Sequence, residues 1–203
     1  MNRLDFSHSF DRGCLFCHMI RATKKDKKTV VAILSDSFTE NKSVLSITRG
    51  KPERVNALMK YAFDTCLDYG YVYLLEDKQG CALILLPDKR KATPKDIWRD
   101  FVFCIRGLGI LNVRKALNRE KLIRQKQIKE HVYHLWFIGV TKEFQHTGKG
   151  STLLKYLLKD ADLKNRRLIL ETSSLENIDW YQKFGLKVYD RLDLDYELKL
   201  ICA

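Results

Sequence analysis

The segment HLWFIGVTKEFQHTGKGSTLLKYLLKD, residues 134–160, decides the fold of this chain. It opens on an apolar run of strand length and closes on ten residues with the apolar spacing of an amphipathic helix. Gly148 and Gly150 lie between these parts and lack the Cβ atoms that hold a ligand away from the backbone. Successive N–H groups at the positive end of the helix can converge there on phosphate oxygens, and Lys149 adds a mobile positive charge. The order predicts a strand, a pyrophosphate-binding loop and a helix.

A second motif lies downstream and makes the first more specific. It consists of a strand-like segment followed by a helical segment, and its residues are Leu170-Glu171-Thr172-Ser173, Asn177, Tyr181 and Phe184-Gly185-Leu186. Together with Gln145-x-x-Gly148-x-Gly150 after Ile138-Gly139-Val140, this order resembles the acetyl-CoA signature of the GNAT superfamily of N-acetyltransferases. The branch that it resembles includes the puromycin-type N-acetyltransferases of small molecules. The resemblance covers residues 133–188.

The resemblance implies an α/β (α+β) architecture, the GNAT fold. In this fold a mixed, mostly antiparallel central sheet has helices on both faces and a splayed cofactor cleft. The cleft is expected where the strands at 134–140 and 168–171 diverge. The last third of the chain agrees, since strand and helix patterns alternate there. The expected segments are strands at 132–140, 168–171, 186–189 and 194–201 and helices at 150–160 and 177–184.

The first two thirds predict helices around a hairpin. A first strand begins near Met19, and a helical rhythm follows from Val30 to Phe38. Pro52 opens a second helix that ends before Gly70. The remaining segments are a β-hairpin at 71–75 and 81–86 and a helical region from 93 to 130 with a break at 107–109. Its apolar residues, among them Ile97, Trp98, Phe101 and Ile105, either pack in the core or line an acceptor pocket.

Length and composition favour one globular domain. The chain has 203 residues, 45% of them hydrophobic, which suits a single core at 19–203. Residues 1–18 lack the apolar core of a secretory signal and read as a disordered leader or extension. No apolar run approaches the roughly 20 residues that span a bilayer. We therefore expect a cytoplasmic protein that does not engage a membrane.

The cysteines indicate thiols, with one cluster that needs separate attention. Six cysteines are spread among apolar or helical segments, which is not the pattern of a disulfide framework. Cys14-x-x-Cys17-His18 matches the pattern of haem attachment, and with His8 it also offers the ligand types of a zinc site. Because haem attachment of this kind requires export and no export signal is present, we expect no metal.

Positive charge gathers in the helical region. The net charge is +12, and residues 88–130 contain 13 Lys or Arg against 5 Asp or Glu. Such a face attracts polyanions, which here means an acidic cofactor, nucleic acid or anionic lipid. The plain alternative is the solvated side of long helices, and we favour it. No RNA-binding signature accompanies the charge, so we do not expect nucleic acid as a partner.

By resemblance, acetyl-CoA is the cosubstrate and its binding residues fall in three groups. The main chain of Ile138, Gly139 and Val140 would pair with the pantetheine arm like an added strand. The pyrophosphate would lie on the loop and helix start formed by Gln145, His146, Thr147, Gly148, Lys149, Gly150 and Ser151. Ser151 either caps the helix or touches phosphate. Asn177 and Tyr181 would contact the cofactor. Asn177 could equally serve as the N-cap of its helix, and the two roles are compatible.

Three side chains are candidates for proton transfer. Tyr181 is expected to protonate the leaving thiolate, because a phenol with a pKa near 10 stays protonated at neutral pH. His134 occupies the place of a glutamate base in histone-acetylating members, and its imidazole can accept the proton of the amine. Strand alternation would put His134, Trp136, Ile138 and Val140 on one face. Glu171 is the second candidate base, or a carboxylate that binds a cationic amine.

These residues predict an acetyl-CoA-dependent N-acetyltransferase of a primary amine, most simply that of a small molecule. Direct attack in a ternary complex needs a held thioester, a neutral amine, oxyanion stabilisation and an acid. Two alternatives stay open. One is acetylation of a protein lysine or N-terminus, and the other is a non-catalytic module that binds CoA or nucleic acid. The chain is expected to be a monomer or a homodimer.

Overall fold

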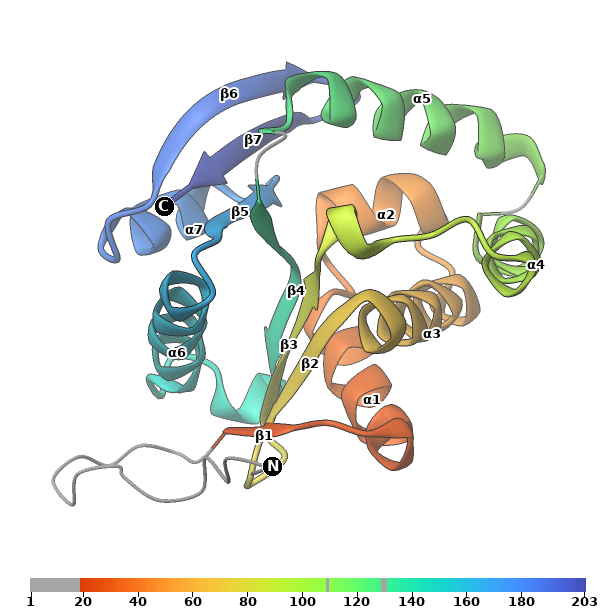
Figure 1. The fold of residues 1–203 in the computed structure, drawn as a ribbon. Coiled ribbons are helices and arrows are strands. Elements are labelled where there is room, and N and C mark those ends of the chain that lie inside the picture. The colour runs from red at the N-terminus through yellow and green to blue at the C-terminus, as the bar shows by residue number, and fades with distance from the viewer. Residues whose placement is uncertain (1–18, 109, 129–130) are drawn as a thin grey trace, which may run out of the picture.

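The computed structural model describes residues 19–108, 110–128 and 131–203, with the backbone alone at 110–112 and 115. Within these residues one sheet has the strand order β1-β2-β3-β4-β5-β7-β6, and β4–β5 is its one parallel pair (Figure 1). The strands are β1 Met19–Arg21, β2 Gly70–Leu75, β3 Gly80–Leu85, β4 Val132–Val140, β5 Arg167–Thr172, β6 Lys187–Asp193 and β7 Glu197–Cys202. The mixed, mostly antiparallel sheet predicted from the sequence is confirmed.

Helices cover both faces of this sheet, as expected (Figure 1). Their bounds are α1 Lys27–Ser37, α2 Lys42–Thr48, α3 Pro52–Tyr69, α4 Pro94–Phe103, α5 Ile110–Lys126, α6 Lys149–Leu163 and α7 Leu175–Gln182. Helices α1, α2 and α3 pack their buried side chains against one face, with Phe137 of β4 among them. Helices α6 and α7 pack against the other face, with Leu135 and Val140. A third cluster joins Ile123 of α5 to strands β6 and β7.

Local signals set the ends of the long helix α3. Pro52 occupies its first turn, where the missing N–H costs nothing, and apolar residues recur on its buried side. Gly70 follows directly and opens β2. A Cβ placed on Gly70 would lie 1.9 Å from the carbonyl oxygen of Ile84, so the close pairing of β2 with β3 requires a glycine there.

The structure adds one helix and resolves the ambiguous region. Helix α2 was not predicted, because a helix of seven residues with two buried side chains gives almost no periodic signal. The expected break after α4 is a π-helical turn at Cys104–Leu108, where a Cβ on Gly107 would lie 2.3 Å from the Phe103 ring. The prediction that Ile97, Trp98 and Phe101 pack in the core is wrong, because all three side chains are exposed.

The expected leader and the Cys14-x-x-Cys17-His18 cluster, with His8, lie outside the described residues. The cysteines that the structure does describe are free thiols, as expected: Cys66, Cys81, Cys104 and Cys202. Burial raises the pKa of Cys66 and Cys81, so both stay protonated and unreactive. No described helix combines the length and the apolar content that crossing a bilayer requires. The described residues also hold no group of three or more potential metal ligands.

A buried carboxylate fastens α6 to the sheet. Asp160 accepts hydrogen bonds from Tyr73 of β2 at 2.8 Å and from Tyr133 of β4 at 2.6 Å, and it also pairs with Lys164. Burial, with the charge of Asp160, raises the pKa of both phenols, so each remains a donor at all ordinary pH values. The helix that follows the glycine loop is thereby held against the two strands.

We predict that Asp160→Ala lowers the free energy of unfolding by about 2–4 kcal/mol, because two buried hydroxyl donors lose their acceptor. The matched control is Tyr73→Phe, which removes one donor and should cost about 1 kcal/mol. Urea unfolding followed by circular dichroism measures both. An equal loss of unfolding free energy in the two variants would contradict the proposed role of the carboxylate in holding α6 to the sheet.

Candidate active site

The site begins where β4 and β5 separate. These parallel strands pair only between 132–134 and 167–169, so the edge of β4 past His134 faces no strand among the described residues. An exposed strand edge offers backbone N–H and C=O groups to an extended chain that adds to it. The splay expected from the sequence is confirmed.

A β-bulge at Trp136 changes which side chains share a face. Leu135 pairs with Ile84 while Phe137 pairs with Leu83, so β4 carries one extra residue between them. Alternation therefore reverses at the bulge. The expectation that His134, Trp136, Ile138 and Val140 share one face is wrong. Ile138 and Val140 belong to the α6 side, whereas Trp136 packs on the side of α1 and α3.

Gly139 is needed for packing. A Cβ on this residue would lie 2.9 Å from Ser37 Oγ and 3.0 Å from Leu34 Cδ2, so its absence lets α1 approach β4. The Ser37 hydroxyl donates a 2.8 Å hydrogen bond to the carbonyl of Val140. Helix α1 thus fixes the end of β4 just before the glycine loop. Backbone contact of Gly139 with a ligand stays a prediction.

The glycine loop leads into α6 in a left-handed conformation. His146 has φ 62° and Gly148 has φ 89°, and Gly148 is the N-cap residue, without a side-chain cap. The N–H of Thr152 makes a 3.0 Å bond to the carbonyl of Gly148. A Cβ on Gly148 would meet nothing within 4 Å, so there is open space at the start of a 15-residue helix. This geometry suits an anion held by backbone N–H groups.

The polar side chains of the loop are already engaged with the protein. Gln145 Nε2 donates to the Val140 carbonyl at 3.3 Å, and Thr147 Oγ1 donates to the Phe144 carbonyl at 2.6 Å. Lys149 pairs with Asp77 in the β2–β3 turn, and its side chain is 17% exposed. The expectation of a mobile Lys149 charge is therefore wrong.

Ser151 and Gly150 connect this loop to α7. Trp180 Nε1 donates a 3.2 Å hydrogen bond to Ser151 Oγ, and the N-cap of α6 is Gly148, so Ser151 is not the cap. A Cβ on Gly150 would lie 3.6 Å from the Trp180 ring, an ordinary contact. The two motifs of the sequence thus meet through this tryptophan.

The two candidate bases touch each other. His134 Nε2 lies 2.7 Å from Glu171 Oε2, and the side chains are 10% and 12% exposed. Gln127 Nε2, from the residue that follows α5, donates to the other carboxylate oxygen at 3.2 Å. The cluster therefore combines strands β4 and β5 with the segment between α5 and β4. Sequence reasoning named His134 and Glu171 separately and missed Gln127, for which the helical pattern of 93–130 offers no signal.

The pair shifts the pKa values of both members. Burial opposes charge on His134, but the Glu171 carboxylate and its hydrogen bond outweigh burial, so the pKa of His134 is raised. Burial likewise opposes charge on Glu171, and the imidazolium and its hydrogen bond lower the pKa of that carboxyl. Because Nε2 faces the carboxylate, Nδ1 is the ring atom left to exchange a proton.

Tyr181 lies on α7 among apolar side chains. Its side chain is 5% exposed, and its ring centroid is 4.8 Å from that of Trp180. Burial raises the pKa of the phenol, so the hydroxyl stays protonated well above neutral pH. Asn177 lies one turn earlier and is exposed. The N-cap of α7 is Ser174, so the expectation that Asn177 caps this helix is wrong.

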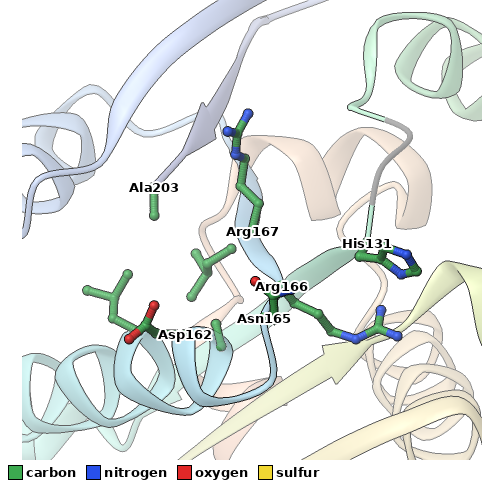
Figure 2. A pocket seen from close by; sticks show the side chains of 9 residues that line it. His131, Asp162, Asn165, Arg166, Arg167 and Ala203 are labelled. Carbon is green, nitrogen blue, oxygen red and sulfur yellow. The ribbon is translucent and has the colours of Figure 1, made fainter.

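A pocket of about 460 Å³ lies elsewhere, at the opposite ends of β4 and β5. Figure 2 shows His131, Arg166 and Arg167 around it, with the two guanidinium groups pointing in different directions. Arg166 already pairs with Asp88 through bonds of 2.7 and 2.8 Å. The polar groups of this pocket do not converge, and the glycine loop follows the other end of β4. We therefore place the candidate site at the splay.

Comparison with known proteins agrees with this arrangement. Residues 107–186 match the model of the Acetyltransferase (GNAT) family. The chain is similar to the solved structure of a histone acetyltransferase HPA2 and related acetyltransferase from Corynebacterium glutamicum, with 17% identity, 91% and 93% of the two chains covered and a TM-score of 0.65. It is similar to a polyamine N-acetyltransferase from Drosophila melanogaster, with 12% identity, 92% and 98% covered and a TM-score of 0.62.

A curated relative matches only a short part of the chain. It is a probable serine/threonine-protein kinase from Dictyostelium discoideum, 32% identical over 71 residues. The match covers 35% of this chain and 8% of the relative. The chain thus spans less than a tenth of that relative's length, and the kinase name describes a protein with far more sequence.

The His134–Glu171 pair predicts a pH dependence of stability. With a raised pKa, His134 stabilises the fold fully below its ordinary value of 6.5, and this contribution is lost as pH rises through the folded pKa. Glu171, with a lowered pKa, contributes above its ordinary value of 4.5 and loses its contribution as pH falls. Glu171→Gln should abolish the decline in the free energy of unfolding above pH 6.5, as urea unfolding between pH 5 and 9 will measure.

The control for this prediction is His134→Gln, which should abolish the same decline because it removes the titrating ring. A decline that persists in Glu171→Gln would show that other groups cause it and that the pair is not an ion pair.

Proposed function

We propose that this chain is an acyl-CoA N-acyltransferase of the GNAT acetyltransferase family, whose model residues 107–186 match, and that it transfers an acetyl group from acetyl-CoA to a primary amine of a small molecule. One observation carries the proposal: an unpaired strand edge leads through an open, left-handed glycine loop into the start of α6. This combination serves a ligand that is extended at one end and anionic at the other.

The residues present fit acetyl-CoA. The main chain of Ile138, Gly139 and Val140 would hold the pantetheine arm, and the backbone of 145–150 would hold the pyrophosphate. The side of Gly148 is open, and no carboxylate caps the helix to compete with phosphate. Ser151 and Asn177 would contribute at the margins of this site. When bound, acetyl-CoA supplies the activated thioester.

We assign the proton transfers to groups of this chain. His134 Nδ1 would accept the proton of the attacking amine, and Glu171 would hold the ring and stabilise its charged form. Because Glu171 is already paired with His134, a role in binding a cationic amine is less suited to it. Tyr181 Oη would return a proton to the leaving sulfur, which its raised pKa permits at neutral pH.

The neighbours are named for different acceptors. The Drosophila neighbour is named for polyamines and the Corynebacterium neighbour for histones. We favour a small amine of the puromycin-type branch because Leu170-Glu171-Thr172-Ser173 is typical of it. Acetylation of a protein lysine or N-terminus is the alternative, and small-amine and peptide panels run side by side decide between them. A cytoplasmic location, one domain at 19–203 and a monomeric or homodimeric state stay predictions.

We predict that acetyl-CoA binds with micromolar affinity and that Gly148→Glu abolishes binding. The added carboxylate would occupy the open space at the helix start and repel the pyrophosphate. Isothermal titration calorimetry measures both proteins. The matched control is Gly148→Asn, because Asn tolerates the left-handed conformation and adds no charge, and it should bind more tightly than the Glu variant. Absence of binding by the natural chain would favour a module without turnover.

We predict that Tyr181→Phe lowers kcat about 10²-fold or more and leaves the Kd for acetyl-CoA unchanged, because the variant lacks only the acid. Release of CoA thiol measures turnover with any accepted amine. Trp180→Phe is a control that alters the neighbouring ring without removing the acid. Turnover of Tyr181→Phe equal to that of the natural chain would exclude Tyr181 as the acid.

A further inference from the structure

Helix α4 binds the rest of the protein with its polar side. Asp96 is 3% exposed and accepts a hydrogen bond from the Tyr69 hydroxyl of α3. The Tyr61 hydroxyl donates to Asp100 at 2.7 Å, and the Arg99 side chain, 11% exposed, pairs with Asp96. A surface helix usually packs its apolar side inward and solvates its polar side. In α4 this arrangement is reversed.

The apolar side of α4 consequently faces outward. Four large side chains that neighbour each other on the helix and the following turn form what we term the α4 apolar face: Ile97 at 64% exposure, Trp98 at 66%, Phe101 at 53% and Ile105 at 48%. The rings of Trp98 and Phe101 lie 5.7 Å apart. A contiguous apolar surface rimmed by polar groups indicates an interaction site.

A groove extends this face towards α5. It has a volume of about 470 Å³ and is lined by Phe101, Cys104, Ile105, Val113, Arg114 and Leu117. Burial raises the pKa of Cys104, so its thiol is neutral. Leu117 is 62% exposed at the far wall. The groove is apolar, with one guanidinium at its rim.

Unpaired cations flank the apolar face. Arg106 and Arg114 are exposed, and neither has a hydrogen-bond or ion-pair partner among the described residues. Lys95 also lies on α4, but it is paired with Asp68 at 2.8 Å. Asp100, the partly exposed carboxylate of this helix, is neutralised by Arg90. The charge left over beside the apolar face is therefore positive, which complements an anionic surface.

We propose that the α4 apolar face, with Arg106 and Arg114, docks this protein on an anionic lipid membrane. Tryptophan and apolar side chains would enter the boundary between headgroups and acyl chains, and the arginines would lie against lipid phosphates. Because the polar side of α4 is fastened to α3, the helix needs no refolding to present its apolar side. The expectation of no membrane rested on the lack of a spanning segment, which peripheral docking does not require.

A second copy of the chain fits this surface less well. An isologous dimer through the α4 apolar face would bring Arg106 and Arg114 of one copy close to the same patch of the other. Like charges at a desolvating interface oppose association. A membrane with anionic lipid uses the apolar side chains and neutralises both cations.

The test is sedimentation of the full chain with vesicles of phosphatidylcholine alone or with phosphatidylglycerol, together with tryptophan emission. Binding is expected only to the mixed vesicles, with a blue shift from Trp98. Trp98→Ser with Phe101→Ser should lower the partition coefficient about tenfold or more, and Arg106→Ser should lower it about fivefold. Leu163→Ser, at a 75% exposed leucine of α6, is the matched control and should change nothing.

Trp98→Phe separates docking from general stickiness. The variant keeps the apolar character of the face, so binding should persist. The blue shift should disappear, because Trp136 and Trp180 still emit but lie outside the α4 apolar face. The proposal would be overturned by no binding to mixed vesicles, by binding that the Trp98→Ser/Phe101→Ser variant retains, or by a vesicle-free dimer that this variant dissociates in analytical ultracentrifugation. A Trp98 that acrylamide cannot quench without vesicles would also overturn it, because the chain itself would then cover the face.

Discussion

Strand β4 is paired with β3 through a bulged ladder from Val140 back to His134, but it accompanies β5 for only three residues. The candidate site depends on this short parallel pairing. His134 belongs to the last paired position, and Glu171 lies two residues beyond the last paired position of β5, so the buried pair forms where the strands begin to separate. Past that point the free edge of β4 runs directly to the glycine loop. One geometric constraint thus places His134 and the proposed cofactor edge on the same strand, with Glu171 on the neighbouring strand.

The bulge at Trp136 distributes these parts between the two faces of the sheet. Before the bulge, Leu135 faces α6 and its neighbour His134 faces the other side, where Gln127, the residue after α5, donates to Glu171. After the bulge, Ile138 and Val140 face α6. In the proposed enzyme the base therefore lies on the face of β4 away from α6, while the end of β4 is packed against α6, the helix that would hold the pyrophosphate. Reversing the alternation costs one extra residue in one strand.

Polar groups are treated differently in the two halves of the molecule. On the α6 side, Asp160 accepts hydrogen bonds from a tyrosine of β2 and a tyrosine of β4, and these bonds hold α6 against the sheet. On the other side, Asp96, Asp100 and Arg99 of α4 bind side chains of α3. The apolar residues of α4 are therefore left in contact with solvent. Because buried charges need partners, the salt bridges of α4 decide its orientation against its own apolar pattern.

The sequence by itself determined the order of the strands and helices along the chain except α2, the glycine loop, both motifs and the names of the proton-transfer candidates. Those features depend on local periodicity, on turn chemistry at Pro52, Gly70 and Gly148, and on residue order, all of which one chain of letters records. The tertiary structure alone decided that His134 and Glu171 touch, that Lys149 is held by Asp77, that Trp136 and Ile138 lie on opposite faces of the sheet and that the apolar side of α4 faces outward. Each of these depends on a partner distant in sequence or on a one-residue shift in register, and neither leaves a periodic signal.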